Sequence, residues 1–134
     1  MEFNLQTGMK AERSEQVTSE NTAIKYGSGG VAVYATPAMV GLIEGTCLAA
    51  VDPHLPSGMA TVGIDLAIKH LAATPVGMTV RATAELTEIA GKKLVFRVEA
   101  YDDKEKIGEG THERYIIDLA KFLKKTESKR ICNT

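Results

Sequence analysis

The chain has 134 residues, enough for one ordinary domain but too few for two full-sized ones, so a single domain spanning residues 1–134 is predicted. Its 16 Lys and Arg residues and 17 Asp and Glu residues leave a formal net charge of -1. That balance predicts no overall attraction to nucleic acid or to an acidic membrane surface, so an anionic ligand would need a local basic patch.

Targeting signals and cysteines indicate the compartment. The N-terminal residues lack the apolar run of a signal peptide, and no stretch approaches the roughly twenty apolar residues of a membrane span. Cys47 lies in an apolar segment and Cys132 in the polar tail, so the two predict neither a disulfide framework nor a zinc motif. We therefore expect a reduced cytoplasmic protein; a secreted protein with one disulfide is the alternative.

The first half of the chain predicts strands that lead into a buried helix. One strand is expected around residues 10–17, a flexible glycine-rich loop at residues 26–30, and an apolar strand at residues 31–35. Thr36 suits a helix N-cap, and the proline after it suits the first helical position. The helix that follows, PAMVGLIEGTCLAAV, has Glu44 as its only ionisable side chain apart from a cysteine, and a helix without a polar face is buried.

The second half changes to a period of two, which is typical of strands. On the first of these strands, residues 59–70, one face should meet the helix. That face carries Val62, Ile64, Leu66, Ile68 and His70. Three more strands and a short C-terminal helix are expected at residues 80–87, 94–101, 107–118 and 119–129, and the last few residues are expected to be disordered. The order predicts an α+β fold in which an antiparallel sheet wraps around one long central helix, with uncovered edges that favour self-association.

Glu44 is the first candidate for chemistry. At about 100° per residue it falls at the margin of the apolar arc of the helix, beside Val40, Leu48 and Val51. A carboxylate there is costly unless it is paired, hydrogen-bonded or protonated, which suits a role in acid–base catalysis. The alternative is a glutamate whose carboxylate reaches water at a dimer seam.

His70 and Thr36 are the next candidates. His70 ends the strand face that should meet the helix, and a lone histidine on an apolar face is either a satisfied core residue or a catalyst. Thr36 is either an ordinary N-cap or part of a site in which the free N–H groups of the helix start hold an oxyanion. Two titratable groups aimed at one helix–sheet interface favour the catalytic interpretation.

Other residues give weaker signals. Gly41 and Gly45 lie one helical turn apart, where glycine costs about 1 kcal/mol each, and are interpreted as allowing close packing by backbone of a strand or subunit. His112 and Arg114 share one face of the last strand; a charged face towards solvent is the default and a substrate-facing arginine the alternative. The segment of residues 121–130, KFLKKTESKR, is rich in basic residues. It predicts a solvated helix that can also attract phosphates.

Three runs of the sequence carry a family resemblance: ATPAMVGLIEGTCLAAVDPHL, TVGIDLAIKHLAATPVGMTV and GEGTHERYIIDLAKF. They resemble the fluoroacetyl-CoA thioesterase family of hot-dog fold proteins along nearly the whole chain. In that family a threonine, a glutamate and a histidine form the active site, spaced 8 and then 26 residues apart. Thr36, Glu44 and His70 match both spacings, since 44 − 36 = 8 and 70 − 44 = 26.

The resemblance implies a hot-dog fold, an acyl-CoA substrate and a homodimer with each active site at the subunit interface; higher oligomers remain open. It implies no cofactor besides the CoA of the substrate, and no metal. Glu44 and Thr36 would act on the thioester carbonyl while His70 positions or polarises the reacting groups, and Gly63 and Arg114 would contact the acyl group. Whether Glu44 attacks directly or activates water stays open.

One departure from the family concerns the substrate. The fluoroacetyl-specific enzyme has a phenylalanine-rich lid before the buried helix, whereas this chain has the glycine-rich residues 26–30 there. The sequence thus predicts hydrolysis of a short or medium acyl-CoA thioester. The reaction of the family is expected here, but not its fluorinated substrate. The alternatives are a non-catalytic acyl-CoA or metabolite binding module, and a hydratase or dehydratase, which relies on a different acid–base pair.

Overall fold

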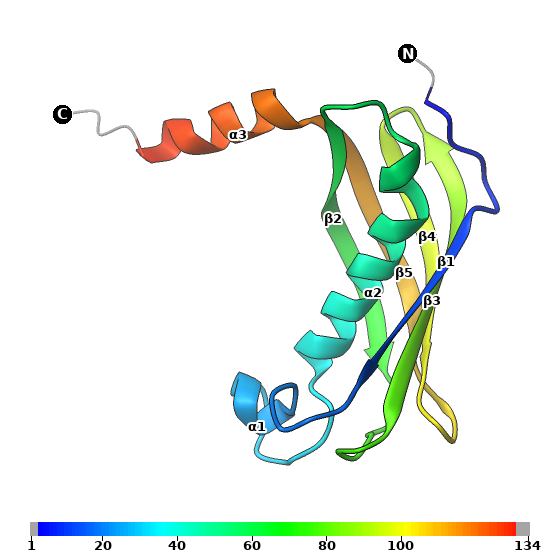
Figure 1. Cartoon of the computed structure of the whole chain (residues 1–134), viewed down its shortest axis with the longest axis vertical. Coiled ribbons are helices and arrows are strands. Elements are labelled where there is room, and N and C mark those ends of the chain that lie inside the picture. The colour runs from blue at the N-terminus through cyan, green and yellow to red at the C-terminus, as the bar shows by residue number, and fades with distance from the viewer. Residues whose placement is uncertain (1–2, 131–134) are drawn as a thin grey trace.

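The computed structural model describes residues 3–130 as a curled sheet of five strands around one long helix (Figure 1). The elements in chain order are β1 (Lys10–Gln16), α1 (Ala23–Tyr26), α2 (Thr36–Val51), a 3₁₀ turn (Asp52–His54), β2 (Met59–His70), β3 (Thr79–Ala90), β4 (Lys93–Tyr101), β5 (Lys106–Asp118), α3 (Leu119–Glu127) and a final 3₁₀ turn (Ser128–Arg130). The last residues, including Cys132, lie outside the described range.

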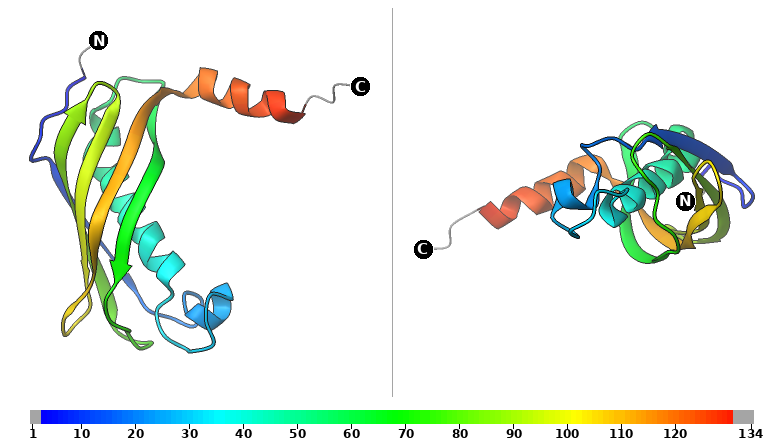
Figure 2. Two further views of the ribbon diagram at one scale, coloured as in Figure 1. Left: turned by 180° about the vertical axis from the view of Figure 1, so that it is seen from behind. Right: turned by 90° about the horizontal axis from the view of Figure 1, so that it is seen from below.

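All strand pairings are antiparallel, and the strand order is β1-β3-β4-β5-β2. The sheet curls around α2, as the view from below shows (Figure 2). The alternation expected for β3 and β4 is confirmed, because their inward side chains are all buried. These are Val80, Ala82, Ala84, Leu86, Leu94, Phe96, Val98 and Ala100. They pack against the buried residues of α2, among them Met39, Ile43 and Cys47.

The segment before α2 differs from the expectation. Residues 31–35 form no strand; only isolated bridges pair Tyr34 with Thr22 and Val33 with Pro75. The short helix α1 lies before the expected loop of residues 26–30 and shares only Tyr26 with it, while residues 27–30 form no helix or strand. The Thr22 side chain caps α1 at its start. At its end Gly27 adopts a φ of 72°, a left-handed conformation that favours glycine. Side-chain capping and a C-terminal glycine thus create a helical turn that the apolar pattern did not reveal.

β2 contains a β-bulge. The register with β5 shifts between Gly63 and Asp65, which leaves Ile64 as the extra residue on β2. One extra residue reverses the sides to which all later side chains point. Ile64 itself is 51% exposed, so the expectation that it faces the helix is wrong.

The bulge explains which side chains of β2 reach the helix. Before it, Thr61 and Gly63 face α2; after it, Ile68 and His70 do. The expected inward direction is therefore confirmed for Ile68 and His70 but wrong for Val62. Strict alternation cannot anticipate an inserted residue, because Val62, Ile64, Leu66 and Ile68 keep the period of two through the bulge.

The two glycines of α2 have different surroundings. A Cβ on Gly45 would lie 2.7 Å from Nη1 of Arg13, so the close packing expected there comes from an arginine side chain of β1 and not from backbone. Nothing in the described part of the chain lies within 4 Å of such an atom on Gly41. Gly41 is exposed, as is Leu48 two turns further along the helix.

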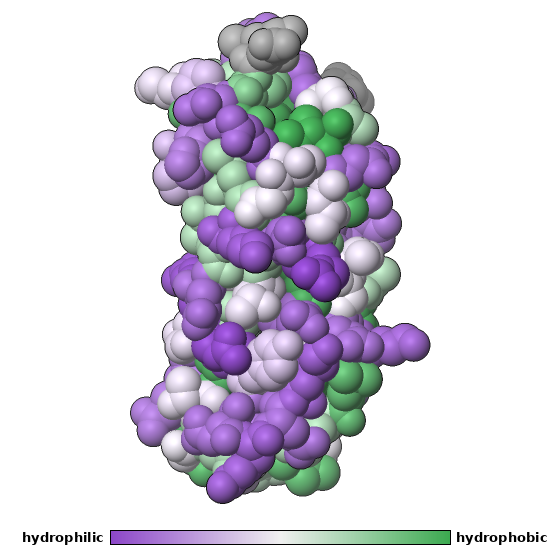
Figure 3. All heavy atoms as spheres, turned by 90° about the vertical axis from the view of Figure 1, so that its right-hand side faces the viewer, coloured by the Kyte–Doolittle hydropathy of each residue, from purple (hydrophilic) through white to green (hydrophobic). Residues whose placement is uncertain are grey.

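The two edges of the sheet contrast in polarity. β1 has the sequence KAERSEQ, and the side of the molecule where it lies is largely hydrophilic (Figure 3). β2, at the other edge, exposes Ile64 and Leu66. Charges protect an edge strand against association, whereas an apolar edge invites it. Of the two edges, that of β2 is the one suited to pairing with another chain.

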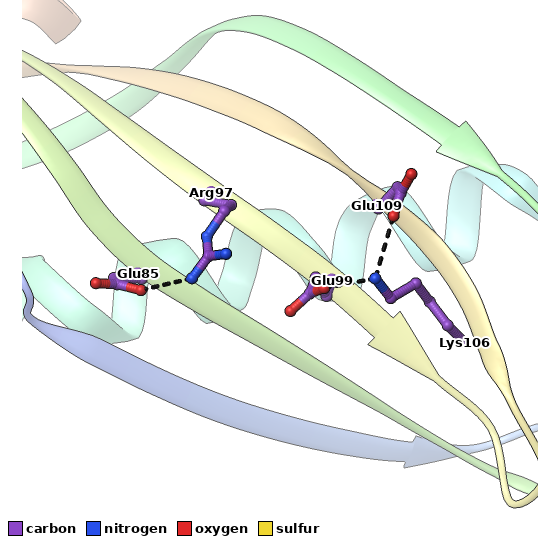
Figure 4. Close-up of polar contacts among 5 residues, drawn as sticks. All are labelled: Glu85, Arg97, Glu99, Lys106 and Glu109. Atoms are coloured by element: carbon purple, nitrogen blue, oxygen red, sulfur yellow. Dashed lines mark hydrogen bonds and ion pairs between the residues drawn. The ribbon is translucent and has the colours of Figure 1, made fainter.

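The outer face of the sheet, opposite α2, is also polar. Arg97 on β4 pairs with Glu85 on β3 at 2.9 Å, and Lys106 on β5 lies 2.7 Å from Glu99 and 3.1 Å from Glu109 (Figure 4). Exposed pairs of this kind contribute little to stability, about 0–1 kcal/mol each. They do keep this face solvated. None of the helices within residues 3–130 is long and apolar enough to cross a membrane.

Candidate active site

Thr36 and His70 come together although 34 residues separate them. The Thr36 hydroxyl lies 2.7 Å from Nδ1 of His70, where the end of β2 meets the start of α2. The N-cap of α2 is Ala35, so Thr36 is the first helical residue and its side chain makes no capping bond. The expectation that Thr36 is an ordinary N-cap is therefore wrong. Its hydroxyl forms a hydrogen bond with His70 instead.

The second ring nitrogen of His70 has no partner. Nε2 is buried and makes no hydrogen bond within the described residues. A buried polar atom without a partner is costly, about 1–3 kcal/mol, and is typical of a site that a ligand completes. Burial lowers the pKa of His70, an effect that the backbone of Ala72 partly offsets. At neutral pH the imidazole is thus neutral, with Nδ1 beside the Thr36 hydroxyl and Nε2 without a partner among the described residues.

The segment before Thr36 is fixed in place. Tyr34 is buried, and its hydroxyl donates a hydrogen bond to the carboxylate of Glu15 on β1. Its backbone N–H donates to the carbonyl of Thr74 at 2.9 Å, and the Thr74 hydroxyl in turn donates to Asp102 at 2.8 Å. These bonds tie the start of α2 to the turns at the end of the sheet. They hold Thr36 at a fixed position relative to His70.

A cavity of about 360 Å³ opens beside Thr36 and His70. Several of the other lining residues are small, namely Ala23, Ser28, Ala72 and Ala73. The lining is completed by Val33, Tyr34 and Leu71. The lining mixes apolar walls with a few polar groups, which is typical of a small-molecule site. The cavity lies between α1, the start of α2 and the end of β2.

Glu44 belongs to a different cluster. Its side chain is half-buried and reaches towards Gly63 of β2, where Oε2 lies 2.9 Å from the position that a Cβ would occupy. The same position is 3.0 Å from Cε1 of His112 and 3.5 Å from Nη1 of Arg114. The missing side chain of Gly63 thus leaves a small space between a carboxylate, an imidazole and a guanidinium. Gly63, Arg114 and Glu44, three of the residues singled out from the sequence, meet here.

Arg114 is held by a buried hydrogen-bond network. It is 5% exposed, so the expectation of a solvated charged face is wrong, and His112 beside it is fully buried. Its Nε donates to the Thr61 hydroxyl at 2.7 Å and its Nη2 to the Thr61 carbonyl at 2.9 Å. The Thr61 hydroxyl itself donates to Asp52 at 2.6 Å. A buried guanidinium requires such partners, and they fix its orientation.

His112 completes this network as an acceptor. Its Nδ1 lies 2.7 Å from the carbonyl of Asp65, which can only accept, so Nδ1 carries the proton. Nε2 then accepts from Nη1 of Arg114 at 3.1 Å. Burial lowers the pKa of His112 and the charge of Arg114 lowers it further, although the bond to Asp65 acts in the opposite direction. Sequence reasoning did not name His112 for the site; its place two residues before Arg114 on one strand face was the available signal.

The two clusters are far apart within one chain. Thr36 and Glu44 are separated by eight residues of α2, or about 12 Å along the helix axis. Gly63 and His70 are separated by seven residues of β2, or roughly 23 Å along the strand. Of the three expected catalytic residues, one chain therefore brings Thr36 and His70 together and leaves Glu44 elsewhere.

Gly63 offers a direct test of the Glu44 cluster. We expect Gly63→Ala to lower the kcat of the acyl-CoA hydrolysis predicted from the sequence at least tenfold, because the new methyl group occupies the position 2.9 Å from Glu44 and 3.0 Å from His112. His112 is fixed by two hydrogen bonds, so the flexible carboxylate of Glu44 moves instead. The free energy of unfolding should decrease by about 1–3 kcal/mol, because the methyl group also lies 3.0 Å from Cε1 of His112, which is held in place. Steady-state kinetics and urea unfolding measure the two effects; unchanged kcat would contradict the expectation.

The half-buried His70 and the buried His112 predict a pH dependence of stability. Burial lowers the pKa of both His70 and His112 below the value of about 6.5 expected in the unfolded chain. As pH falls below about 6.5, the unfolded chain binds protons that the folded chain does not, so the free energy of unfolding decreases. Their contribution is complete above that pH and is lost as pH falls towards the folded-state pKa values.

Urea unfolding between about pH 7.5 and pH 5.5 measures this effect, in a range above the titration of ordinary carboxylates. The His112→Gln variant should show a shallower decrease than the unchanged protein. An equal slope in both proteins would show that His112 does not contribute.

No group of three or more His, Cys, Asp or Glu side chains within residues 3–130 is arranged to hold a metal ion. Cys47 is buried and free, and burial raises the pKa of its thiol to about 12. A thiol with so high a pKa is a poor nucleophile. The polar chemistry of the described residues is thus concentrated in the Thr36–His70 pair and the Glu44 cluster.

The architecture defines the class of fold. A hot-dog-like protein from Thermanaerovibrio acidaminovorans has a similar solved structure, with a TM-score of 0.85 at 20% sequence identity, over 97% of this chain and 96% of that one. At this level of identity the likeness shows the fold alone. The curled antiparallel sheet around a long central helix is a hot-dog fold, as expected from the sequence.

Sequence similarity then identifies the family. The family model of the fluoroacetyl-CoA-specific thioesterase matches residues 17–120. The fluoroacetyl-CoA thioesterase of Streptantibioticus cattleyicolor is 46% identical over 97 residues, which cover 72% of this chain and 70% of the relative. A threonine-to-serine variant of the fluoroacetyl-CoA enzyme, solved in complex with acetyl-CoA, is 36% identical with a TM-score of 0.87, over 93% of this chain and 98% of that one. The chain belongs to the fluoroacetyl-CoA-specific thioesterase family.

Proposed function

We propose that the protein hydrolyses a short or medium acyl-CoA thioester to the free acid and CoA. The observation that carries this proposal is the free Nε2 of His70, which is buried beside Thr36 in a cavity of about 360 Å³. Membership of the thioesterase family supports it, as does the complex of a relative with acetyl-CoA. The CoA is part of the substrate, and the reaction needs no separate cofactor or metal.

In the proposed reaction Glu44 acts on the thioester carbonyl. Its carboxylate either attacks the carbonyl carbon to give an anhydride, which water then cleaves, or accepts a proton from an attacking water molecule. The carbonyl oxygen gains negative charge in both routes, and the unpaired N–H groups in the first turn of α2 suit its stabilisation. Thr36 and His70 orient the thioester, and the CoA thiolate leaves. After a single turnover in ¹⁸O-labelled water, label in the carboxylate of Glu44 identifies direct attack followed by attack of water on the Glu44 carbonyl of the anhydride. Attack of water on the acyl carbon places the label in the released acid in both routes.

The proposed site is completed by a second copy of the chain. Glu44 is about 12 Å along α2 from Thr36, so one chain cannot place both on one carbonyl. β2 is an unprotected sheet edge that exposes Ile64 and Leu66. We propose a homodimer in which the two β2 strands pair in an antiparallel manner around a twofold axis. Glu44 of one protomer then approaches Thr36 and His70 of its partner.

The same requirement fixes the register of the proposed dimer. Glu44 lies beside Gly63, so Gly63 of one β2 strand has to lie opposite His70 of the other. Such pairing is centred near Leu66 and Ala67, in the middle of the exposed strand edge. The apolar Leu66 is 44% exposed in a single chain and becomes covered at this centre. Association and completion of the site therefore require the same pairing.

The experiment that tests the proposed function is hydrolysis of a panel of acyl-CoAs with detection of free thiol. The panel contains acetyl-, fluoroacetyl-, butyryl-, hexanoyl-, octanoyl- and benzoyl-CoA. We expect turnover that Glu44→Gln lowers by about 10²- to 10⁴-fold. Tight binding of an acyl-CoA without release of thiol would instead identify a binding module. Crotonyl-CoA is assayed beside the panel, and addition of water to its double bond without thiol release would identify a hydratase.

A further inference from the structure

α3 is an amphipathic helix that projects away from the body of the molecule (Figure 1). Leu119, Phe122 and Leu123 have the i, i+3, i+4 spacing of one helix face, and all three are exposed. A helix of nine residues is marginal in water without packing. An apolar face on so short a helix indicates that another surface covers it.

The position of α3 limits what can cover it. The N–H of Leu119 donates to the carbonyl of Gly58 at 2.9 Å, which joins the start of α3 to the start of β2. A groove of about 700 Å³ lies at this junction, lined mainly by apolar side chains that include Met59, Leu119 and Leu123. α3 thus continues the free edge of β2. A chain that pairs along β2 reaches α3 as well.

Antiparallel pairing of two β2 strands determines which surface of the second copy meets α3. With Gly63 opposite His70, Met59 at the start of one strand lies opposite the residues that follow His70 in the other. Leu71 and Val76 lie in that segment and are 48% and 52% exposed. α3 and this segment are at opposite ends of one chain (Figure 2), so only the partner's α3 meets the segment in the dimer.

We propose that the apolar face of α3 docks on the second copy of the chain, against Leu71 and Val76, where it forms one wall of the acyl pocket. This inference rests on the proposed dimer and deepens the proposed function. Leu71 also lines the cavity that contains Thr36 and His70, so the docked helix covers the rim of that cavity. The partner's α3 thereby takes the place of a lid that residues 26–30 are too glycine-rich to form.

The charge of α3 agrees with this position. Residues 119–130 contain five basic side chains and one acidic one. The basic side chains lie away from the apolar face, so they remain solvated when that face is covered. At the mouth of the partner's site they attract the phosphate groups of CoA, an interaction that salt screens.

Chemical cross-linking tests the docking without any need for catalysis. In a Cys132→Ser background, with Cys47 buried, Leu123→Cys is combined with Leu71→Cys and treated with a short bismaleimide. We expect a covalent dimer on a denaturing gel. Leu123→Cys paired with Thr87→Cys, on the exposed side of β3, is the matched control and should remain monomeric. Cross-linking of Leu123→Cys alone would show that two α3 helices pair with each other and would overturn the proposal.

Kinetics tests the role of α3 in the pocket. We expect Leu123→Asp to raise KM for a medium-chain acyl-CoA roughly tenfold, with a smaller effect on acetyl-CoA, because a longer acyl group contacts more of the missing wall. Ile89→Asp, an equally charged change at the exposed β3–β4 turn, is the control. Equal KM values for Leu123→Asp and the unchanged protein at every chain length, together with no cross-link, would refute the inference. An enzyme without thioesterase activity that still forms the cross-link would refute the proposed function and leave the docking intact.

Discussion

Replacement of Glu44 by glutamine is expected to lower kcat for acyl-CoA hydrolysis by about 10²- to 10⁴-fold, the range measured for loss of a general base. Glutamine has the shape of glutamate but can neither attack the carbonyl nor accept a proton at neutral pH. The half-buried side chain keeps its place beside Gly63, so the fold and KM should change little. Stopped-flow or steady-state detection of free CoA measures the effect.

The matched control is Glu88→Gln, the same change at an exposed residue of β3. It should leave kcat unaltered, and circular dichroism should show both variants folded. If Glu44→Gln retained full turnover, the carboxylate would have no chemical role. Its position at the margin of the apolar arc would then reflect only contact with water at the dimer seam.

The strands of the second half were predictable because their side chains alternate without interruption. β3 and β4 follow the period of two, and Phe96 and Leu86 are buried as the pattern requires. The limits of β2, residues 59–70, also agree with the expected strand. The bulge at Ile64 escaped prediction because the large apolar residues stay at every second position through it, so the sequence contains no sign of the change of side.

The site was predictable in part. Glu44 and His70 stand out as titratable groups among apolar residues, and Thr36 joins them through the family spacing. Arg114 was expected on a solvated face because charged residues are seldom buried without partners. The partners exist, but Thr61 lies 53 residues earlier in the chain and His112 had no evident role. Hydrogen bonds over such separations depend on the fold and leave no local pattern.

The separation of the candidate residues into two clusters was not evident from the sequence. The spacings of eight and 26 residues place Thr36 and Glu44 on the helix and His70 on the following strand. They do not determine whether the three side chains lie at the same end of these two elements. In the structure, β2 runs along α2 so that His70 lies at the helix start and Gly63 beside Glu44. The bulge then aims Gly63 and His70 to the same side of β2 despite their odd separation. The proposed homodimer would bring the two clusters together.

Two inactive variants should restore activity when they share a dimer. Glu44→Gln removes the carboxylate and His70→Ala removes the imidazole, so each homodimer should be nearly inactive. In a dimer of one chain of each kind, one site takes Glu44 from the His70→Ala chain and His70 from the Glu44→Gln chain. That site is intact, while the other lacks both groups. We expect the purified mixed dimer to have about half of the unaltered kcat per dimer, since one of two sites works.

Coexpression of the two variants with different affinity tags, followed by two successive purifications, isolates the mixed dimer for this measurement. The control is a dimer in which both chains carry Glu44→Gln but have different affinity tags. It should remain inactive. A site contained within one chain would lack one essential group in every protomer, so no combination of these variants would recover turnover. Recovered activity therefore indicates a site shared between two chains across β2. No recovery would indicate a site formed within one chain, in which the Glu44 side chain reaches Thr36 and His70 of the same protomer.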